Sequence, residues 1–139
     1  SERRVRFYEM EYAVPREDGL EAFSRVRALI DTLDRPISFP IEFRILGGDE
    51  IPLSTAAGRD SCFIAVHVFR GTPYDQYFRG VEAIMDDYNG RPHWGKLHFQ
   101  DANVLADRYP QWDRFQAARD RLDPARRFTN DYLDRVLGP

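Results

Sequence analysis

The apolar residues of this chain recur with two different periods, and each change of period marks a predicted element. Residues 5–14 alternate between the two faces of a strand, and residues 20–33 repeat every three to four positions, as in a helix. Pro15 separates the two elements, and Arg35-Pro36 closes the helix. The strand places Tyr8, Met10, Tyr12 and Val14 on one face and Phe7, Glu9 and Glu11 on the other. The expected apolar stripe of the helix is Leu20, Phe23, Val26, Ile30 and Leu33.

Two further strands are predicted in the middle of the chain. Residues 41–45 alternate strictly, so Glu42 and Arg44 are expected to project together from one face, about 7 Å apart. Residues 62–70 are apolar on both faces, which is typical of a central strand. The residues of the first of these strands that are expected to face a core are Ile41, Phe43 and Ile45.

Helical spacing returns in the second half of the chain. A helix is predicted from Pro73 to Tyr88, and Asp101 is expected to cap a short helix that ends at Arg108. A longer helix is expected before Asp123-Pro124, and a terminal helix over 130–137, capped by Asn130. The stripe of the first helix is Tyr74, Tyr77, Phe78, Val81, Ile84, Met85 and Tyr88, and that of the third is Trp112, Phe115 and Leu122.

The predicted order is strand, helix, strand, strand, helix, followed only by helices. This grouping favours an α+β fold with a mainly antiparallel sheet, helices packed on one face and further helices at the C-terminal end. A chain of 139 residues matches one domain of common size, and it shows no internal repeat. We therefore interpret residues 1–139 as a single domain.

Composition narrows the classes of protein that fit. Apolar residues make up 42% of the chain, which excludes disorder, and no apolar run is long enough for a membrane-spanning helix. The 20 basic and 23 acidic residues are interspersed, so binding to nucleic acid is not expected. The single cysteine, Cys62, lies in an apolar run. We expect a buried, unreactive thiol in a cytoplasmic protein, with peripheral membrane association left open.

Signatures of metal and nucleotide sites are sparse. His93 and His98, taken with His67 and Cys62, lack the compact spacing of zinc ligands, so no metal site is predicted. The chain also lacks a glycine-rich phosphate-binding loop and a Gly-x-Ser-x-Gly nucleophile turn. These residues alone are therefore not expected to bind a nucleotide.

One lysine stands among 19 arginines. Lys96 lies in the stretch Arg91-Pro92-His93-Trp94-Gly95-Lys96-Leu97-His98, which also holds two of the three histidines. Lysine supplies a compact ammonium whose pKa burial can change, whereas arginine is a permanently charged fork, so a site that needs a point charge or a proton would retain lysine. Chance retention in an arginine-rich chain is the alternative. We interpret this segment as a candidate functional loop or short extended piece, entered through the turn signal Asn89-Gly90.

Glu42 and Arg44 are a second candidate pair. Such a pair commonly forms an ordinary solvated strand face. Beside a lone lysine, however, the pair also suits a hydroxylated or carboxylated small molecule, because carboxylates accept hydrogen bonds from hydroxyls and cations hold oxyanions. His67, in an apolar strand, is more typical of a hydrogen-bonded core histidine than of a catalyst.

Several short motifs occur in a fixed order along the chain, and together they resemble a known family. The similarity is to the C-terminal region of the FAD-linked aldonolactone and alditol oxidases, the branch of the vanillyl-alcohol-oxidase-type flavoenzymes that includes gulonolactone and D-arabinono-1,4-lactone oxidases. It runs nearly end to end. The motifs are Glu9-Met10-Glu11-Tyr12 with Val14-Pro15, Ile41-Glu42-Phe43-Arg44, Leu53-Ser54 with Gly58-Arg59-Asp60, Ala65-Val66-His67, Arg91 to Lys96, and Asp123-Pro124 with Phe128, Asn130, Tyr132 and Leu133.

The resemblance implies that residues 1–139 are the C-terminal substrate-cap domain of an FAD-dependent oxidoreductase. The FAD would be bound mainly by an N-terminal domain that is absent from this chain, and that domain would be its partner. The implied reaction is hydride transfer from an alcohol carbon of a sugar lactone or polyol to the flavin N5. Separated from its FAD-binding domain, such a cap is expected to be inactive and to self-associate through exposed apolar surface.

The resemblance also assigns roles to particular positions. Glu42, Arg44 and Lys96 become the catalytic candidates, and the ammonium of Lys96 is expected within about 6 Å of the other two. The implied substrate-binding residues are Glu42, Arg44, His67, His93 and Ser54, and the implied cofactor-binding residues are His93 and Lys96.

One position departs from the family pattern. Many members carry a tryptophan before Leu53-Ser54, where this chain has Pro52. The identity of the lactone or polyol therefore stays open, as do the electron acceptor and the linkage of the FAD. The alternative function is that of a non-enzymatic α+β module that binds a small ligand or a partner protein.

Overall fold

The computed structural model describes residues 4–139 and contains four strands and five α-helices. The strands are β1 (Phe7–Pro15), β2 (Glu42–Leu46), β3 (Ser61–Phe69) and β4 (Arg91–Pro92). The helices are α1 (Gly19–Ile30), α2 (Asp75–Asp86), α3 (Ala102–Arg108), α4 (Trp112–Leu122) and α5 (Asp131–Leu137), with a 3-10 turn η1 (Arg16–Asp18) before α1. The predicted order of elements is confirmed. Residues 91–92, within a segment predicted as a loop or a short extended piece, form the short strand β4.

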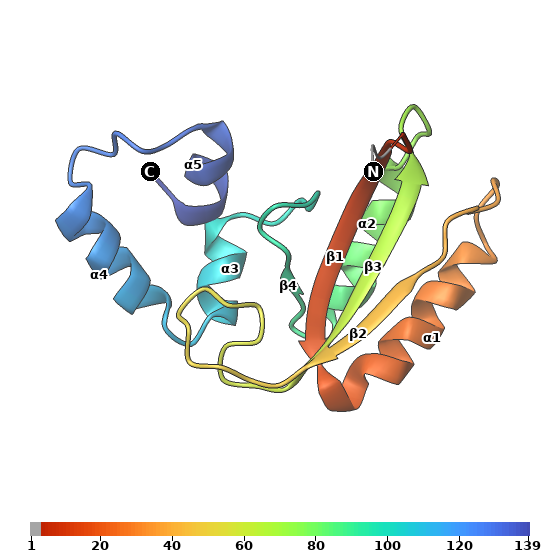
Figure 1. The fold of residues 1–139 in the computed structure, drawn as a ribbon, viewed down its shortest axis with the longest axis horizontal. Helices are drawn as coiled ribbons and strands as arrows, with labels where there is room; N and C mark the ends of the chain where they lie inside the picture. Colours follow the sequence, from red (N-terminus) through yellow and green to blue (C-terminus); the bar gives the residue numbers. More distant parts are fainter. Residues whose placement is uncertain (1–3) are drawn as a thin grey trace.

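The four strands form one antiparallel sheet in the order β2-β3-β1-β4. Helices α1 and α2 cover one face of this sheet, and α3, α4 and α5 lie together beyond β4 (Figure 1). The predicted α+β fold is therefore confirmed. Asp101 caps α3 and Asn130 caps α5 through their side chains, as the sequence predicted.

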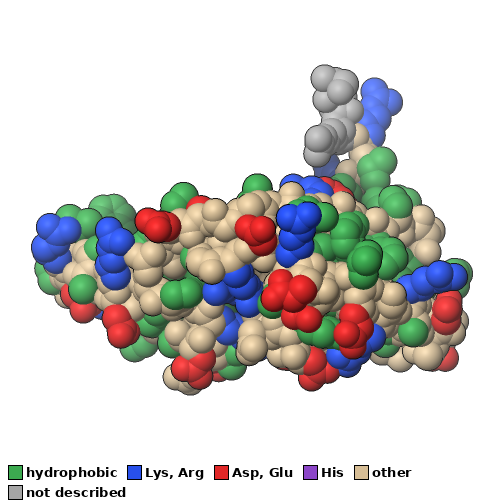
Figure 2. Space-filling view, turned by 90° about the horizontal axis from the view of Figure 1, so that it is seen from below, with side chains coloured by type: hydrophobic (Ala, Val, Ile, Leu, Met, Phe, Trp, Pro, Cys, Tyr) green, Lys and Arg blue, Asp and Glu red, His purple; other side chains and the backbone are tan. Residues whose placement is uncertain are grey.

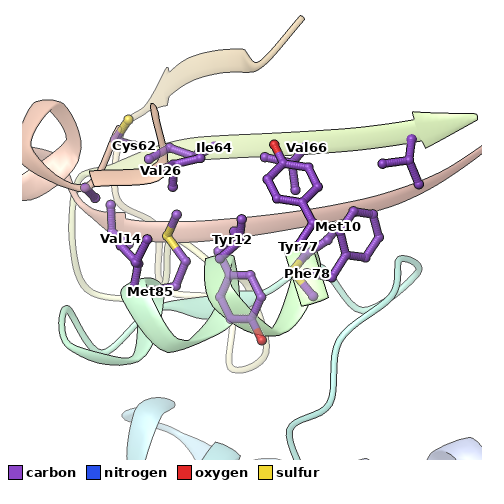
Figure 3. Packing of buried hydrophobic residues seen from close by; sticks show 14 residues of the cluster. Met10, Tyr12, Val14, Val26, Cys62, Ile64, Val66, Tyr77, Phe78 and Met85 are labelled. Atoms are coloured by element: carbon purple, nitrogen blue, oxygen red, sulfur yellow. The ribbon is translucent and has the colours of Figure 1, made fainter. Parts of the chain in front are cut away.

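The main core lies between the sheet and the two covering helices. Because alternate residues of a strand point to opposite faces, β1 and β3 each supply one apolar row to this layer. Phe78 and Met85 of α2 pack against both rows and are fully buried (Figure 3). The two rows are Met10, Tyr12 and Val14 from β1, and Cys62, Ile64, Val66 and Val68 from β3.

Cys62 is buried in this core, as predicted. A Cβ atom added at Gly19, the first residue of α1, would lie 2.7 Å from the Cys62 sulfur, so the helix packs closely on the thiol. Burial raises the pKa of the thiol to about 11. The reactive thiolate is therefore scarce at neutral pH.

Three predicted core positions are wrong. Leu20 of α1, Ile45 of β2 and Leu122 of α4 are each more than half exposed. β2 is an edge strand, and α4 has no fully buried residue because it packs at the outer end of the molecule (Figure 1). Periodicity identifies the apolar face of an element, but it does not show whether another element covers that face.

The surface mixes charges of both signs with apolar side chains. Acidic and basic groups lie side by side across the face drawn in Figure 2, and hydrophobic groups gather below the N-terminal segment. Within residues 4–139, no helix combines the length and the apolar character needed to cross a membrane.

Candidate active site

The sheet face opposite α1 and α2 carries charged side chains. Strand alternation turns Glu9 and Glu11 of β1 away from the core, because their neighbours Met10 and Tyr12 point into it. The same rule applies to Glu42 and Arg44 of β2, which flank the packed Phe43. We call the resulting group the charged face. Its members are Glu9, Glu11, Glu42, Arg44, His67 and Lys96.

Strand register sets the spacing on this face. Ala65 of β3 pairs with Glu42 on one side and with Glu11 on the other, so the two carboxylates lie in one row with a methyl group between them. The next row brings Glu9 opposite His67. The centre of the face is thus a small residue flanked by two glutamates, with Glu9 in the next row.

Ion pairs link the charged face into one chain. Arg44 binds two carboxylates: its Nε lies 3.0 Å from Glu42 Oε1, and its Nη2 donates to Glu11 Oε1. The Lys96 ammonium donates to the other oxygen of Glu11 and lies 2.5 Å from Glu9 Oε1. That oxygen of Glu9 is also 3.1 Å from His67 Nε2.

A tight turn places Lys96 above the two glutamates of β1. Backbone hydrogen bonds join His93 N to Glu11 O and Leu97 N to Glu9 O, both at 2.9 Å, so the chain continues along β1 on either side of the turn. A bond of 3.1 Å from Lys96 N to His93 O closes it. The turn is thus paired with the backbone of Glu9 and Glu11. This pairing brings the Lys96 ammonium to the carboxylates of the same two residues.

The turn is also held from its outer side. Trp94 Nε1 donates to Leu53 O at 2.9 Å, and the indole ring lies 5.2 Å from the ring of Tyr109. The hydroxyl of Tyr132 on α5 donates to Trp94 O at 2.5 Å. The loop that carries Lys96 is therefore pinned by the C-terminal helices as well as by the sheet.

Electrostatics make Lys96 a fixed positive charge. Burial lowers the pKa of its ammonium, but hydrogen bonds and charges from Glu11 and Glu9 outweigh burial, and the pKa is raised. Burial acts in the other direction on Glu9 and raises the pKa of its carboxyl, but Lys96 and then His67 bring that pKa below its ordinary value. Lys96 is therefore suited to act as a fixed point charge. To carry a proton at neutral pH, its pKa would have to be lowered instead.

A shallow hollow of about 460 Å³ opens beside this lysine. Its polar wall is formed by Glu9 and Lys96, and its apolar wall by aromatic and aliphatic side chains. Among the described residues, no group of three or more His, Cys, Asp and Glu side chains could hold a metal ion. The full lining is Phe7, Tyr8, Glu9, Trp94, Gly95, Lys96, Leu97 and Tyr132.

The structure brings some of the sequence-predicted residues together and not others. Lys96 lies on the same face as Glu42 and Arg44, although its contacts with them run through Glu11. His93 accepts from Gly95 N through its own ring at 3.1 Å, and Ser54 donates to Asp49 at 2.5 Å, so both bond within their own loops. The catalytic and binding roles of these residues stay predictions.

Two residues of the charged face, Glu9 and Glu11, were given no role in the site by the sequence analysis. They were placed on one face of the first strand and within one of the family motifs only. Their side chains are well covered, and that of Glu11 is 0% exposed. The signal in the sequence was the Glu-x-Glu alternation on a strand whose other face is entirely apolar. Both carboxylates on such a strand must contact either cations or water.

Buried His98 helps to attach α5 to the Lys96 loop. Its Nε2 lies 3.0 Å from the hydroxyl of Tyr132. Because that hydroxyl donates to Trp94 O, His98 supplies the proton of the shared hydrogen bond. Burial, assisted by the positive charge of Arg135, lowers the pKa of His98 to about 4.

We expect His98 to make the protein lose stability in mild acid. An unfolded histidine binds a proton near pH 6.5, whereas the folded one does so only near pH 4, so the free energy of unfolding falls as the pH falls between these values. At about 1.4 kcal/mol per pH unit the full effect is about 3 kcal/mol. Urea denaturation at pH 7 and pH 4.5 measures it.

The matched variants are His98→Gln and His93→Gln. His98→Gln should reduce the difference in stability between the two pH values, and the exposed His93 should not. Comparing differences is necessary because buried Glu82 titrates with a raised pKa and contributes a slope of opposite sign. An unchanged difference in His98→Gln would contradict the prediction.

Comparison with known proteins agrees with the ordered motifs. The profile of the family described as D-arabinono-1,4-lactone oxidase matches residues 1–136. The chain is 61% identical over 139 residues to L-gulono-1,4-lactone dehydrogenase of Mycobacterium tuberculosis, and it covers 32% of that protein. It is 34% identical over 141 residues to L-gulonolactone oxidase of Bos taurus, with 98% of this chain and 32% of that protein covered.

A third relative has a different named activity. Alditol oxidase of a Streptomyces species is 34% identical over 130 residues, which cover 91% of this chain and 31% of that protein. The chain thus spans about a third of the length of these curated relatives. The resemblance inferred from the motifs is confirmed, and the chain belongs to the D-arabinono-1,4-lactone oxidase family of aldonolactone and alditol oxidoreductases.

Proposed function

We propose that this chain is the substrate-facing, C-terminal part of an FAD-dependent enzyme that oxidises an alcohol group of a sugar lactone or polyol. The observation that carries the proposal is the meeting of Glu42, Arg44 and Lys96 on one face through the buried Glu11. If Glu42 and Arg44 formed an ordinary solvated strand face, Lys96 would not be expected to bind the same carboxylate as Arg44, which is 52 residues away in the sequence.

Charge on this face favours a neutral, hydroxylated substrate. Its three carboxylates outnumber its two permanent cations, so the formal charge is −1 when His67 is neutral. An anionic sugar acid would be repelled, whereas a lactone or polyol can donate hydroxyl protons to the carboxylates and accept from Arg44. The half-exposed side chains of Glu42 and Arg44 retain room for such contacts.

Lys96 would stabilise negative charge at the reacting carbon's oxygen. Lys96 lines the hollow, its side chain is mostly covered, and its ammonium is kept protonated by Glu11 and Glu9. A preorganised cation of this kind lowers the barrier because it needs no rearrangement when the charge develops. Glu9, on the same wall of the hollow, is the acceptor best placed for a substrate hydroxyl.

The residues present fit one edge of a flavin rather than the whole of FAD. The hollow combines a cation with apolar and aromatic walls, which suits a planar polar ring, but residues 4–139 offer no loop for a pyrophosphate. Lys96 and the backbone of Trp94 and Gly95 would approach the ring. A bound flavin would supply the hydride acceptor.

The isolated chain is expected to be colourless and to leave L-gulono-1,4-lactone, D-arabinono-1,4-lactone and alditols unoxidised, because it lacks most of the FAD site. The complete coding sequence, expressed from its own start, should give a yellow protein whose flavin is bleached anaerobically by one of these compounds. Absorbance at 450 nm measures both.

Stoichiometric flavin on the isolated chain would contradict this division of the site. A complete protein that binds flavin but is not bleached by any sugar lactone or alditol would contradict the substrate class. A complete protein without flavin would favour the non-enzymatic alternative.

A further inference from the structure

Within residues 4–139, Glu11 is the most completely buried charged residue. Its side chain is 0% exposed, and both of its oxygens are occupied by cations. Oε1 accepts from Arg44 on β2, and Oε2 accepts from Lys96 in the loop after β4. These cations come from positions 33 and 85 residues further along the chain.

A buried carboxylate requires such partners. Removed from water, it is strongly unfavourable unless cations and hydrogen bonds replace its hydration. The strand fixes its place, because Met10 and Tyr12 on either side are locked in the core. The two cationic groups, by contrast, lie at the tips of long, flexible side chains. Glu11 is therefore the rigid member of the group, and the cations take their positions from it.

The floor of the sheet permits this arrangement. Arg44 must cross β3 to reach β1, because β3 lies between the two strands. At the crossing, the register places Ala65 in the row of Glu11, and the guanidinium lies 5.7 Å from the ring of Phe63. The small alanine leaves the path open, and the aromatic ring supports the cation.

We propose that Glu11 is a positioning residue: its buried carboxylate holds the Arg44 guanidinium and the Lys96 ammonium side by side on the charged face. Glu9 does not duplicate it, because Glu9 contacts Lys96 and His67 but is not bonded to Arg44 in this network. Glu42 does not duplicate it either, because its ion pair is with Arg44. Glu11 alone joins the two cations.

The single lysine of the chain gives a direct test. A sample of the 139-residue protein labelled with 15N only at lysine has one side-chain Nζ signal, which reports the protonation of Lys96. In Glu11→Gln the midpoint of this titration should fall by about one pH unit or more, because an opposite charge in contact shifts a pKa by about that amount. The crossing of Arg44 should loosen at the same time. A second sample, labelled with 15N at arginine, should show this as exchange broadening of the Arg44 Nε signal.

Asp75→Asn is the matched control. It also removes one negative charge, from an exposed carboxylate on α2 whose ion pair is with Arg79. The Lys96 midpoint should then move by less than about 0.2 units, since exposed and distant charges are screened. A midpoint in Glu11→Gln that stays as close to the wild-type value would overturn the proposal.

Glu11→Asp covers the case in which Glu11→Gln does not fold. Aspartate keeps the charge on a side chain that is one methylene shorter, so it cannot hold both cations in the same positions. The Lys96 signal should remain at high pKa but shift and broaden with that of Arg44. Signals identical to the wild type would overturn the proposal.

Turnover is the second readout, and it rests on the function proposed above. In the complete enzyme, Glu11→Gln should lower kcat by roughly 10²-fold with a smaller change in KM. The reason is that misplaced cations weaken the stabilisation of the transition state more than the binding of the substrate. The alkaline loss of activity should begin at lower pH, in step with the Lys96 midpoint. A purely structural role would lower the amount of folded enzyme without moving this pH profile.

The two readouts separate the two ideas. A shifted Lys96 midpoint in a protein that oxidises no lactone or polyol would retain the positioning role and reject the proposed function. Wild-type kcat and pH profile for Glu11→Gln in an active enzyme would reject the positioning role and retain the function.

Discussion

Replacing Lys96 with alanine in the complete enzyme is expected to lower kcat by roughly 10² to 10³-fold, the usual effect of removing one preorganised group that stabilises developing charge. KM should change less, because the ammonium acts mainly on the charge that appears in the transition state. Steady-state rates with the best lactone or polyol, normalised to bound flavin, measure the effect. The alanine also leaves Glu11 with Arg44 as its remaining cation and Glu9 with His67 as its remaining partner, so the Tm must be recorded beside the rate.

Lys96→Arg and Arg25→Ala are the informative companions. Lys96→Arg keeps the charge but should recover little activity, because a planar fork cannot place its charge at the point between Glu9 and Glu11 that the ammonium occupies. Arg25→Ala removes a partly exposed cation of α1, on the other side of the sheet, and should leave kcat unchanged. Full activity in Lys96→Ala would show that Lys96 serves the fold and not the reaction.

Phe78→Ala is expected to cause the largest loss of stability. Phe78 is fully buried between α2 and the sheet, with the rings of Tyr74 and Tyr77 at 5.2 and 5.7 Å (Figure 3). Its removal exchanges a close-packed aromatic ring for a cavity that the surrounding strands cannot fill, which costs about 3 to 5 kcal/mol. Urea denaturation should show this loss, and the Tm should fall by roughly 10 to 20 °C.

Phe128→Ala provides the control for the same change of residue type. Phe128 is 83% exposed, so its truncation should change the free energy of unfolding by less than about 0.5 kcal/mol. Equal losses for the two variants would mean that the layer of α2 on the sheet is not the main core.

The sequence predicted most of the elements because they depend on local rules. Alternation in residues 5–14 and helical spacing in residues 73–88 persist whatever the rest of the chain does, and caps such as Asp101 act on the backbone beside them. The errors occur at positions whose burial depends on contact with another element. Leu20 and Ile45 lie at the ends of predicted apolar faces whose other members, such as Phe23 and Phe43, pack on the core.

The candidate site shows the same division. The sequence identified Lys96 by its rarity and placed Glu42 and Arg44 on one strand face, because both inferences need only neighbouring residues. It did not show that Glu9 and Glu11 stand between them. That fact depends on β1 lying next to β3 and on the turn after β4 pairing back onto β1.

The sequence by itself therefore determined the elements, the family motifs and the residues that could carry charge chemistry. Only the tertiary structure decided which charges share a carboxylate. A strand's face follows from the positions of its own residues, but strand order and register follow from contacts made across the whole chain, and a shift of one residue turns every side chain to the other face. Glu11 could become the common partner of Arg44 and Lys96 only when that register was set.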